Sequence, residues 1–176
     1  VTFDFAYITI HGTPGEDGRL QGYFDMLHIP YSCCGVLAAS LTYDKFACNQ
    51  YLKGFGVRIA ESLLLRGGQS VTDEDVMEKI GLPCFIKPSL GGSSFGVTKV
   101  EHEGDAAELA AAVYEASRHD WRILVEQGID AREIECAVLC PKAGEAPQAS
   151  WPGEIVLDKR AEGDDQFYDF DSKYMD

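Results

Sequence analysis

Basic residues are scarce in this 176-residue sequence. It has 15 Lys and Arg against 29 Asp and Glu, a formal net charge of −14 at pH 7. The excess is uneven, because residues 1–100 carry 10 acidic and 8 basic residues, and residues 101–176 carry 19 and 7. Such a field repels nucleic acid and anionic membranes. We therefore expect neither as a partner, and an anionic ligand would have to be held by local lysines and backbone amides.

Long apolar runs and a leader peptide are also missing. No apolar stretch approaches the roughly 20 residues that span a bilayer. The first residues, VTFDF, lack the basic segment and the small-residue cleavage site of a signal peptide. They also lack an initiator Met, which indicates a piece of a longer protein that begins inside a strand. Hydrophobic residues make up 45%, as in globular proteins, and the length suits one medium domain or two small ones.

The cysteines form neither a metal-binding pattern nor a disulfide framework. The six are Cys33, Cys34, Cys48, Cys84, Cys136 and Cys140. They lack the two C-x-x-C pairs typical of a zinc site, so we expect no metal there. Cys84 lies in an apolar run, where a free cysteine behaves as a small buried hydrophobic residue. The pattern predicts free thiols in a reducing cytoplasm.

The distribution of apolar and turn-forming residues predicts an α+β fold with antiparallel sheets. Strands are expected at residues 5–10, 58–65, 84–88, 97–100, 122–126, 133–140 and 155–157. Helices are expected at residues 18–27, 41–54, 72–80 and 105–117. Thr72 would cap the third helix and Gly81 would end it. The two strands around residue 92 would form an antiparallel hairpin with a long tip.

The strongest local motif is FIKPSLGGSSFG, residues 85–96. A strand presents Lys87 near its end, and the loop of residues 89–96 contains three glycines and three serines. Glycines let backbone amides approach an anion, and serine hydroxyls add donors. The lysine precedes the glycines, so this is not a Walker A loop. The motif indicates a polyphosphate site, and a flexible hairpin tip with a surface lysine is the alternative.

Two further segments place polar residues at the ends of strands. HGTPGEDG, residues 11–18, holds His11, which could donate to a carboxylate, and Glu16, which could orient His11 or a basic group. A turn that caps the next helix would also explain it. Glu126 ends one strand and Glu133 opens the next. Such a pair suits acid–base chemistry, metal binding or recognition of hydroxyls, or it lies on a solvated edge.

The last motif is aromatic. Residues 167–174, FYDFDSKY, place four aromatic residues around one lysine. Such a segment could be a lid that closes over a ligand and excludes water. A small hydrophobic cluster under a loop is the alternative.

In this order the segments resemble the D-alanine–D-alanine ligase family. The series is HG-x-x-GEDG, then Tyr-Asp-Lys at 43–45, then IKP-x-x-GGSS-x-G, then VEQ…REI, then FYDF-x-x-KY. Each motif is weak alone, but five in one order are specific. They cover essentially the whole chain.

The resemblance implies an α+β, ATP-grasp-like fold with three domains. Residues 1–44 would end the N-terminal domain, residues 45–126 would form the central lid domain, and residues 127–176 would begin the catalytic domain. The family reaction phosphorylates the carboxylate of one D-alanine with ATP, and the amine of a second D-alanine then attacks the acyl phosphate. D-alanyl-D-alanine for peptidoglycan, ADP and phosphate result. Such catalysis depends on positioning and charge neutralisation.

The resemblance also implies contacts for most of the nucleotide. The lysines on the ATP phosphates would be Lys45, Lys87 and Lys173. The loop that closes over the γ-phosphate would contain Gly92, Ser93 and Ser94. The adenine would meet Glu126 and the backbone of Gln127 and Ile129, and the ribose would meet Glu133.

The substrate side is implied by the same resemblance. His11 and Glu16 match the family's substrate-side pair. Tyr174 matches a tyrosine that hydrogen-bonds to Ser93 and locks the lid over the substrates. Tyrosine at this position favours an amine-using ligase over a D-alanine–D-lactate ligase, which is the alternative within the ATP-grasp carboxylate ligases.

Parts of the family pattern do not occur in this sequence. The first family segment, which grips the amine of one D-alanine, is absent, and so is the last third with R-x-D and E-x-N. The Mg²⁺ ligands are therefore expected outside this chain, and the chain alone is expected to be inactive, as a non-catalytic nucleotide-binding fragment would be. Leu90 stands where relatives often carry Arg. A homodimer is implied by resemblance alone.

Overall fold

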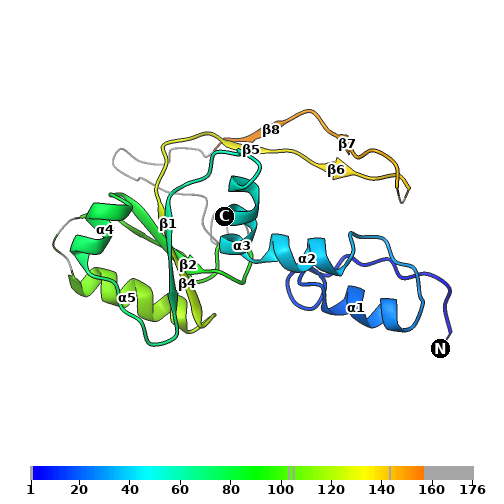
Figure 1. The fold of residues 1–176 in the computed structure, drawn as a ribbon, viewed down its shortest axis with the longest axis horizontal. Coiled ribbons are helices and arrows are strands. Elements are labelled where there is room, and N and C mark those ends of the chain that lie inside the picture. The colour runs from blue at the N-terminus through cyan, green and yellow to red at the C-terminus, as the bar shows by residue number, and fades with distance from the viewer. Residues whose placement is uncertain (1, 103, 105, 143, 157–176) are drawn as a thin grey trace. The chain divides into compact units, whose positions relative to one another are not determined.

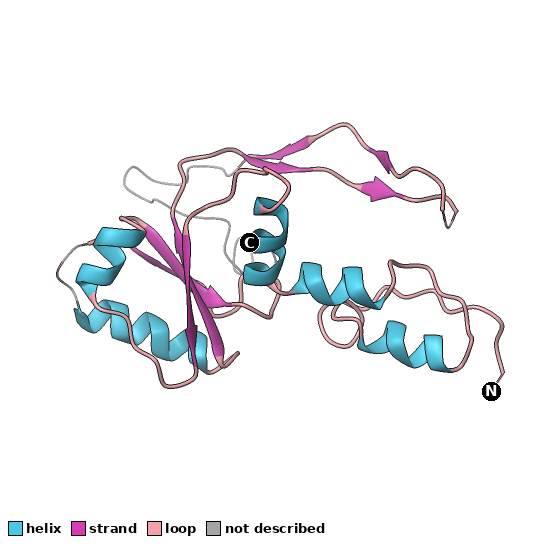
Figure 2. Cartoon of the chain, viewed as in Figure 1, coloured by secondary structure: helices cyan, strands magenta, loops and turns pink. Residues whose placement is uncertain are grey.

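The computed structural model describes residues 2–102, 104, 106–142 and 144–156, and Figure 1 shows their helices and strands. The chain divides into two compact units, which meet in sequence between Gly128 and Ile129. Both units contain antiparallel sheets, and the first also contains helices (Figure 2). The predicted α+β class is confirmed. None of the helices in the described ranges is long and apolar enough to cross a membrane.

The strand predicted at residues 5–10 is wrong. The described residues there form one isolated parallel bridge, between Ala6 and Tyr31. The amide of Ala6 donates to the Pro30 carbonyl at 2.9 Å, and Ser32 donates to the Ala6 carbonyl at 3.0 Å. A strand needs a neighbour for a ladder of hydrogen bonds, and this segment has one only at that bridge. Helix α1, Arg19–Met26, follows as predicted.

The single helix predicted at residues 41–54 is also wrong, because two helices occupy this region. Helix α2 spans Val36–Tyr43, helix α3 spans Lys45–Lys53, and Asp44 separates them with φ −89° and ψ 104°. The Asp44 carboxylate accepts a hydrogen bond from the Ala47 amide at 3.0 Å. An aspartate in extended conformation that binds an amide three residues later is an N-cap, so α3 begins anew at this point.

Four antiparallel strands form the main sheet. They are β1 (Ser62–Arg66), β2 (Cys84–Pro88), β3 (Thr98–Val100) and β4 (Arg122–Gln127), in the order β1-β4-β2-β3. The predicted hairpin is confirmed as the pair of β2 and β3. In the pairing of β2 with β4, Phe85 lies opposite Glu126 and Lys87 lies opposite Leu124.

Two helices cover one face of this sheet and enclose the core. They are α4 (Asp73–Lys79) and α5 (Ala106–Ser117), which lie on one side of the strands in Figure 1. Ile86 and Val125 point toward them and are fully buried. Thr72 caps α4 by accepting from the Asp75 amide at 3.2 Å, and Gly81 follows with φ +81°. Both predicted helix signals are confirmed.

The opposite face of the sheet carries polar residues. Side chains alternate between the two faces of a strand, so Phe85, Lys87 and Glu126 point away from α4 and α5. Helix α3 lies on this side of the sheet (Figure 1). Its Asn49 side chain reaches Glu126. The alternation therefore separates an apolar core from a polar face beside α3.

The second unit contains two small ladders. Strand β5 (Glu133–Glu135) pairs with β8 (Gly153–Ile155), and β6 (Val138–Leu139) pairs with β7 (Gln148–Ala149). The predicted strand at residues 133–140 is thus divided, because the Ala137 amide donates to the Ser150 hydroxyl at 3.0 Å and interrupts the ladder. Strand β7 lies where a loop was predicted, and β8 begins earlier than the predicted strand at 155–157. The predicted aromatic lid lies outside the described residues.

Candidate functional site

The polar face of the sheet centres on Glu126. Its Oε2 is paired with the ammonium group of Lys87, and its Oε1 accepts a hydrogen bond from Asn49 Nδ2 at 3.2 Å. The side chains of Lys87 and Glu126 are 18% and 15% exposed. Both oxygens of the Glu126 carboxylate thus have partners, and the ion pair fixes Lys87 at a partly buried position.

A second lysine lies beside this pair. Lys45, the first residue of α3, donates from Nζ to the carbonyl of Gly91 at 2.5 Å. Burial, and then the nearby charge of Lys87, hold the pKa of Lys45 below its ordinary value. Two ammonium groups that disfavour each other's charge are stabilised when an anion enters between them. This arrangement therefore favours a strongly anionic ligand such as a polyphosphate.

The Gly/Ser loop, residues 89–96, connects β2 to β3 next to these lysines. Ser93 and Ser94 have φ values of +55° and +59°, in the left-handed region that few residues other than glycine adopt. Such conformations cost about 1 kcal/mol or more each and concentrate at ligand clamps. Their succession turns the backbone sharply, as in loops whose amides enclose an anion.

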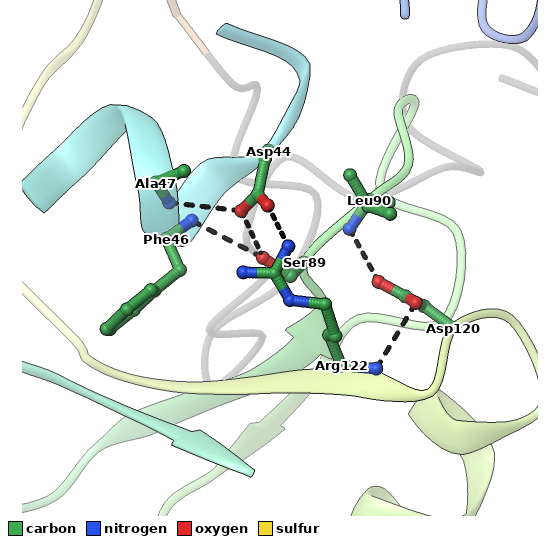
Figure 3. Close-up of polar contacts among 7 residues, drawn as sticks. All are labelled: Asp44, Phe46, Ala47, Ser89, Leu90, Asp120 and Arg122. Carbon is green, nitrogen blue, oxygen red and sulfur yellow. Dashed lines mark hydrogen bonds and ion pairs between the residues drawn. The ribbon is translucent and has the colours of Figure 1, made fainter. Parts of the chain in front are cut away.

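The base of this loop is fixed by buried polar residues, as Figure 3 shows. The Asp44 carboxylate accepts from the Ser89 hydroxyl at 2.8 Å and is paired with the guanidinium group of Arg122. Burial favours the neutral acid, but hydrogen bonds from Ala47 and Ser89 and the charge of Arg122 outweigh it and lower the pKa of Asp44. Asp120 accepts from the Leu90 amide at 2.8 Å.

The HGTPGEDG segment lies next to the same loop. A cavity of about 460 Å³ is lined by Thr13 and Asp17 from this segment and by Leu90, Gly91 and Phe95 from the Gly/Ser loop, among others. The structure therefore brings two of the predicted motifs together. His11 and Glu16 are exposed and are not among the lining residues.

Glu16 acts within its own segment. Its Oε2 accepts from the amide of Gly12 at 2.6 Å, next to His11. The carboxylate therefore holds the backbone of the turn, which the sequence did not indicate. The role of His11 and Glu16 toward a substrate stays a prediction.

The other predicted contacts are distributed over the two units. Gln127 ends β4, and its amide donates to the Glu61 carbonyl at 2.9 Å, so a contact from this backbone to a base would use the carbonyl. Ile129 and Glu133 are exposed in the second unit. Lys173 and Tyr174 lie outside the described residues. The described ranges hold no group of three or more His, Cys, Asp or Glu that could bind a metal ion.

The residues that position the predicted site residues were not predicted; they are Asp44, Asn49, Ser89 and Arg122. Asn49 gives no signal, because an asparagine within a helix is not distinctive. Asp44 does give one, since an aspartate before a helical segment is a frequent N-cap. The expectation of one continuous helix concealed it. The bond of Ser89 and the ion pair of Arg122 arise only when distant segments meet.

Comparison with known proteins gives a consistent result. A family model described as "D-ala D-ala ligase C-terminus" matches residues 51–176. The D-alanine--D-alanine ligase of Bifidobacterium adolescentis is 64% identical, over 98% of this chain and 49% of its own length. That of Bacteroides thetaiotaomicron is 62% identical, over 99% of this chain and 50% of its own length.

Solved structures agree. The D-alanine-D-alanine ligase from Coxiella burnetii has a TM-score of 0.79 at 33% identity, covering 89% of this chain and 45% of that one. The VanG D-Ala:D-Ser ligase from Enterococcus faecalis has a TM-score of 0.77 at 32% identity, covering 91% and 45%. The chain thus spans about half the length of the relatives that it matches.

Proposed function

The chain belongs to the D-alanine–D-alanine ligase family, and on that basis we propose that it forms the nucleotide-binding part of a ligase that joins two D-alanine molecules with ATP. The dipeptide would serve peptidoglycan synthesis in the cytoplasm. The observation that carries the proposal is the convergence of two lysines from separate elements on one Gly/Ser loop. Lys45 opens α3, Lys87 lies on β2, and the loop follows β2.

The nucleotide contacts implied by the family resemblance are supported by this geometry. The ammonium groups of Lys45 and Lys87 would neutralise the ATP phosphates, which is the main requirement of phosphoryl transfer. Backbone amides and hydroxyls around Gly92, Ser93 and Ser94 would enclose the γ-phosphate. Glu126, already oriented by Asn49, would accept from the exocyclic amine of adenine. In this arrangement Lys87 exchanges its partner Glu126 for a phosphate when ATP binds.

The chemical steps balance without further reactants. The carboxylate of one D-alanine attacks the γ-phosphorus of ATP and ADP leaves. The amine of the second D-alanine then attacks the acyl carbon, the new C–N bond forms, phosphate leaves with the C–O bond electrons and the nitrogen gives up one proton to solvent or phosphate. Mg²⁺ would accompany the ATP, and we propose that its ligands lie outside the described residues.

The remaining assignments are proposals on the same basis. The division at residues 44 and 126, the contacts of Gln127, Ile129, Glu133 and Lys173, and a homodimer are supported by family resemblance. So are the substrate roles of His11 and Glu16, and the bond between Ser93 and Tyr174 that would close the lid.

A chimera tests the reaction. The 176 residues would replace the matching half of the Bifidobacterium adolescentis ligase, to which they are 64% identical. We expect ADP release that depends on D-alanine, together with D-alanyl-D-alanine. Lys87→Met in the chimera should abolish most of this activity. Lys79→Met should not, because Lys79 lies in α4, which covers the opposite face of the sheet.

The choice of second substrate separates the alternatives. The chimera would be offered D-alanine, D-lactate or D-serine as the attacking molecule, and the products separated by mass spectrometry. A dominant ester product would identify a D-alanine–D-lactate ligase, and a dominant D-alanyl-D-serine product would favour the specificity named for VanG. A folded chimera that binds ATP and forms no product would favour a non-catalytic nucleotide-binding role.

A further inference from the structure

We propose that Asp44 is a positioning residue for the nucleotide phosphates, because its buried carboxylate fixes Lys45 and the Gly/Ser loop relative to each other. The inference rests on the proposed function, since it takes Lys45 as a phosphate ligand. Asp44 itself would touch neither the nucleotide nor the reacting atoms. It would act through the residue that follows it in sequence.

Three distant segments meet at this carboxylate (Figure 3). Oδ1 accepts from the hydroxyl of Ser89, 45 positions away, and Oδ2 is paired with Arg122, 78 positions away. Asp44 is 6% exposed and Ser89 is fully buried. Oδ1 also accepts from the Ala47 amide and so caps α3. One side chain thus joins the start of a helix, the end of β2 and the start of β4.

The position of Lys45 depends on this junction. Its backbone amide donates to the carbonyl of Ser89 at 3.0 Å, and its Nζ donates to the carbonyl of Gly91 at 2.5 Å. Asp44 and Leu90 also form an isolated antiparallel bridge. The lysine is therefore held at both its backbone and its tip by the first residues of the loop.

The loop base is fixed from its other side as well. Asp120 accepts from the amides of Leu90 at 2.8 Å and of Arg122 at 3.2 Å. The Ser89 amide donates to the Arg122 carbonyl at 2.8 Å. With its base anchored in this way, the loop can present its following amides in one place, and Asp44 sets where Lys45 lies against them.

The ion pair between Asp44 and Arg122 is by itself weak evidence for a stabilising role. Desolvating a carboxylate and a guanidinium group costs about as much free energy as their attraction returns, and well-packed apolar residues would hold the junction as firmly. The pair supplies direction, because planar charged groups bond strongly in only a few orientations. That property suits a junction that must hold the Lys45 side chain in one direction.

The test uses the 176-residue chain and four variants. Asp44→Asn keeps an oxygen for the Ser89 hydroxyl and the helix cap but removes the charge that faces Arg122. Lys45→Ala and the double variant complete a mutant cycle. Asp75→Asn is the matched control, since it removes the charge of an aspartate paired with Lys79 in α4. Calorimetry would measure the affinity for ATP with Mg²⁺ and for adenosine, which lacks phosphates.

We expect Asp44→Asn to weaken ATP about fivefold to tenfold and adenosine by less than about twofold. In the Lys45→Ala background, Asp44→Asn should change the affinity for ATP by less than about twofold. Asp75→Asn should change neither affinity. Equal losses for ATP and adenosine, or full additivity with Lys45→Ala, would show a merely structural role and overturn the proposal.

A ligand-free measurement separates this inference from the proposed function. The backbone amide NMR signals of Leu90 and Gly91, which contact Asp44 and Lys45, should move in Asp44→Asn and stay in place in Asp75→Asn. Unmoved signals would overturn the positioning role even if ATP binds. If the parent chain does not bind ATP but the signals move in Asp44→Asn, the proposed nucleotide site is wrong and the junction at Asp44 still stands. If Asp44→Asn does not fold, Ser89→Ala removes the bridging hydroxyl and is expected to give the same pattern.

Discussion

Replacing Lys87 with Met tests the polar face of the sheet directly. The substitution keeps most of the aliphatic side chain and removes the ammonium group that pairs with Glu126. A hydrogen bond to a charged group contributes about 1.5–3 kcal/mol. In the free protein the same ammonium group is already paired with Glu126, so ATP must replace an existing partner. We therefore expect a loss near the lower limit, about tenfold in the dissociation constant of ATP.

The same substitution has an expected effect on stability. The side chain of Glu126 is 15% exposed and would lose its lysine partner. The free energy of unfolding, measured in urea, should therefore fall by about 1–2 kcal/mol. Asn49 would still donate to the carboxylate, which limits the loss. This value is below that of a fully buried pair because solvent reaches both partners.

Lys79→Met is the matched control. It removes an equal charge from a lysine paired with Asp75, so the net charge changes identically. Calorimetry with ATP and urea unfolding would be done on both variants. If the two variants bound ATP equally well, Lys87 would not belong to the site. If Lys87→Met lost affinity without losing stability, the pair with Glu126 would not hold the free protein as described.

Three further outcomes are expected. ATP affinity should fall as pH rises and should begin to fall below 10.5, the ordinary pKa of lysine, because burial and Lys87 lower the pKa of Lys45 and only the ammonium form attracts phosphate. Calorimetry across pH checks this, and Lys45→Arg should remove the part of the decline that begins below 10.5. The thiol of Cys84 is fully buried with a pKa of about 11, so a thiol reagent at neutral pH should spare it while modifying the exposed cysteines, and peptide mapping would reveal early labelling if this is wrong. Ile86→Ala should lower the free energy of unfolding, measured in urea, by about 2–5 kcal/mol, because Ile86 is fully buried in the core. Ile129 is 58% exposed, and an equally small loss in Ile86→Ala and Ile129→Ala would contradict the described core.

The sequence by itself determined the elements whose signals are local. Strand β2 appears at the predicted residues because apolar residues end abruptly at a Gly/Ser run. Thr72 caps α4 and Gly81 follows it because both signals act within a few residues. The order of the motifs was sufficient to indicate the family. That resemblance also predicted Lys45 and Lys87 as phosphate ligands before any geometry was known.

Only the tertiary structure decided what depends on distant partners. Residues 5–10 have a strand-like pattern, but a pattern cannot provide the neighbour that a ladder requires, and one bridge forms. Helical periodicity continues through Asp44, whereas the break there is stabilised by Ser89 and Arg122. The pairing of Glu126 with Lys87 and Asn49 depends on the register of β2 against β4 and on the placement of α3. These contacts of Asp44 and Glu126 join residues 39 to 78 positions apart, and no local preference encodes which of them meet.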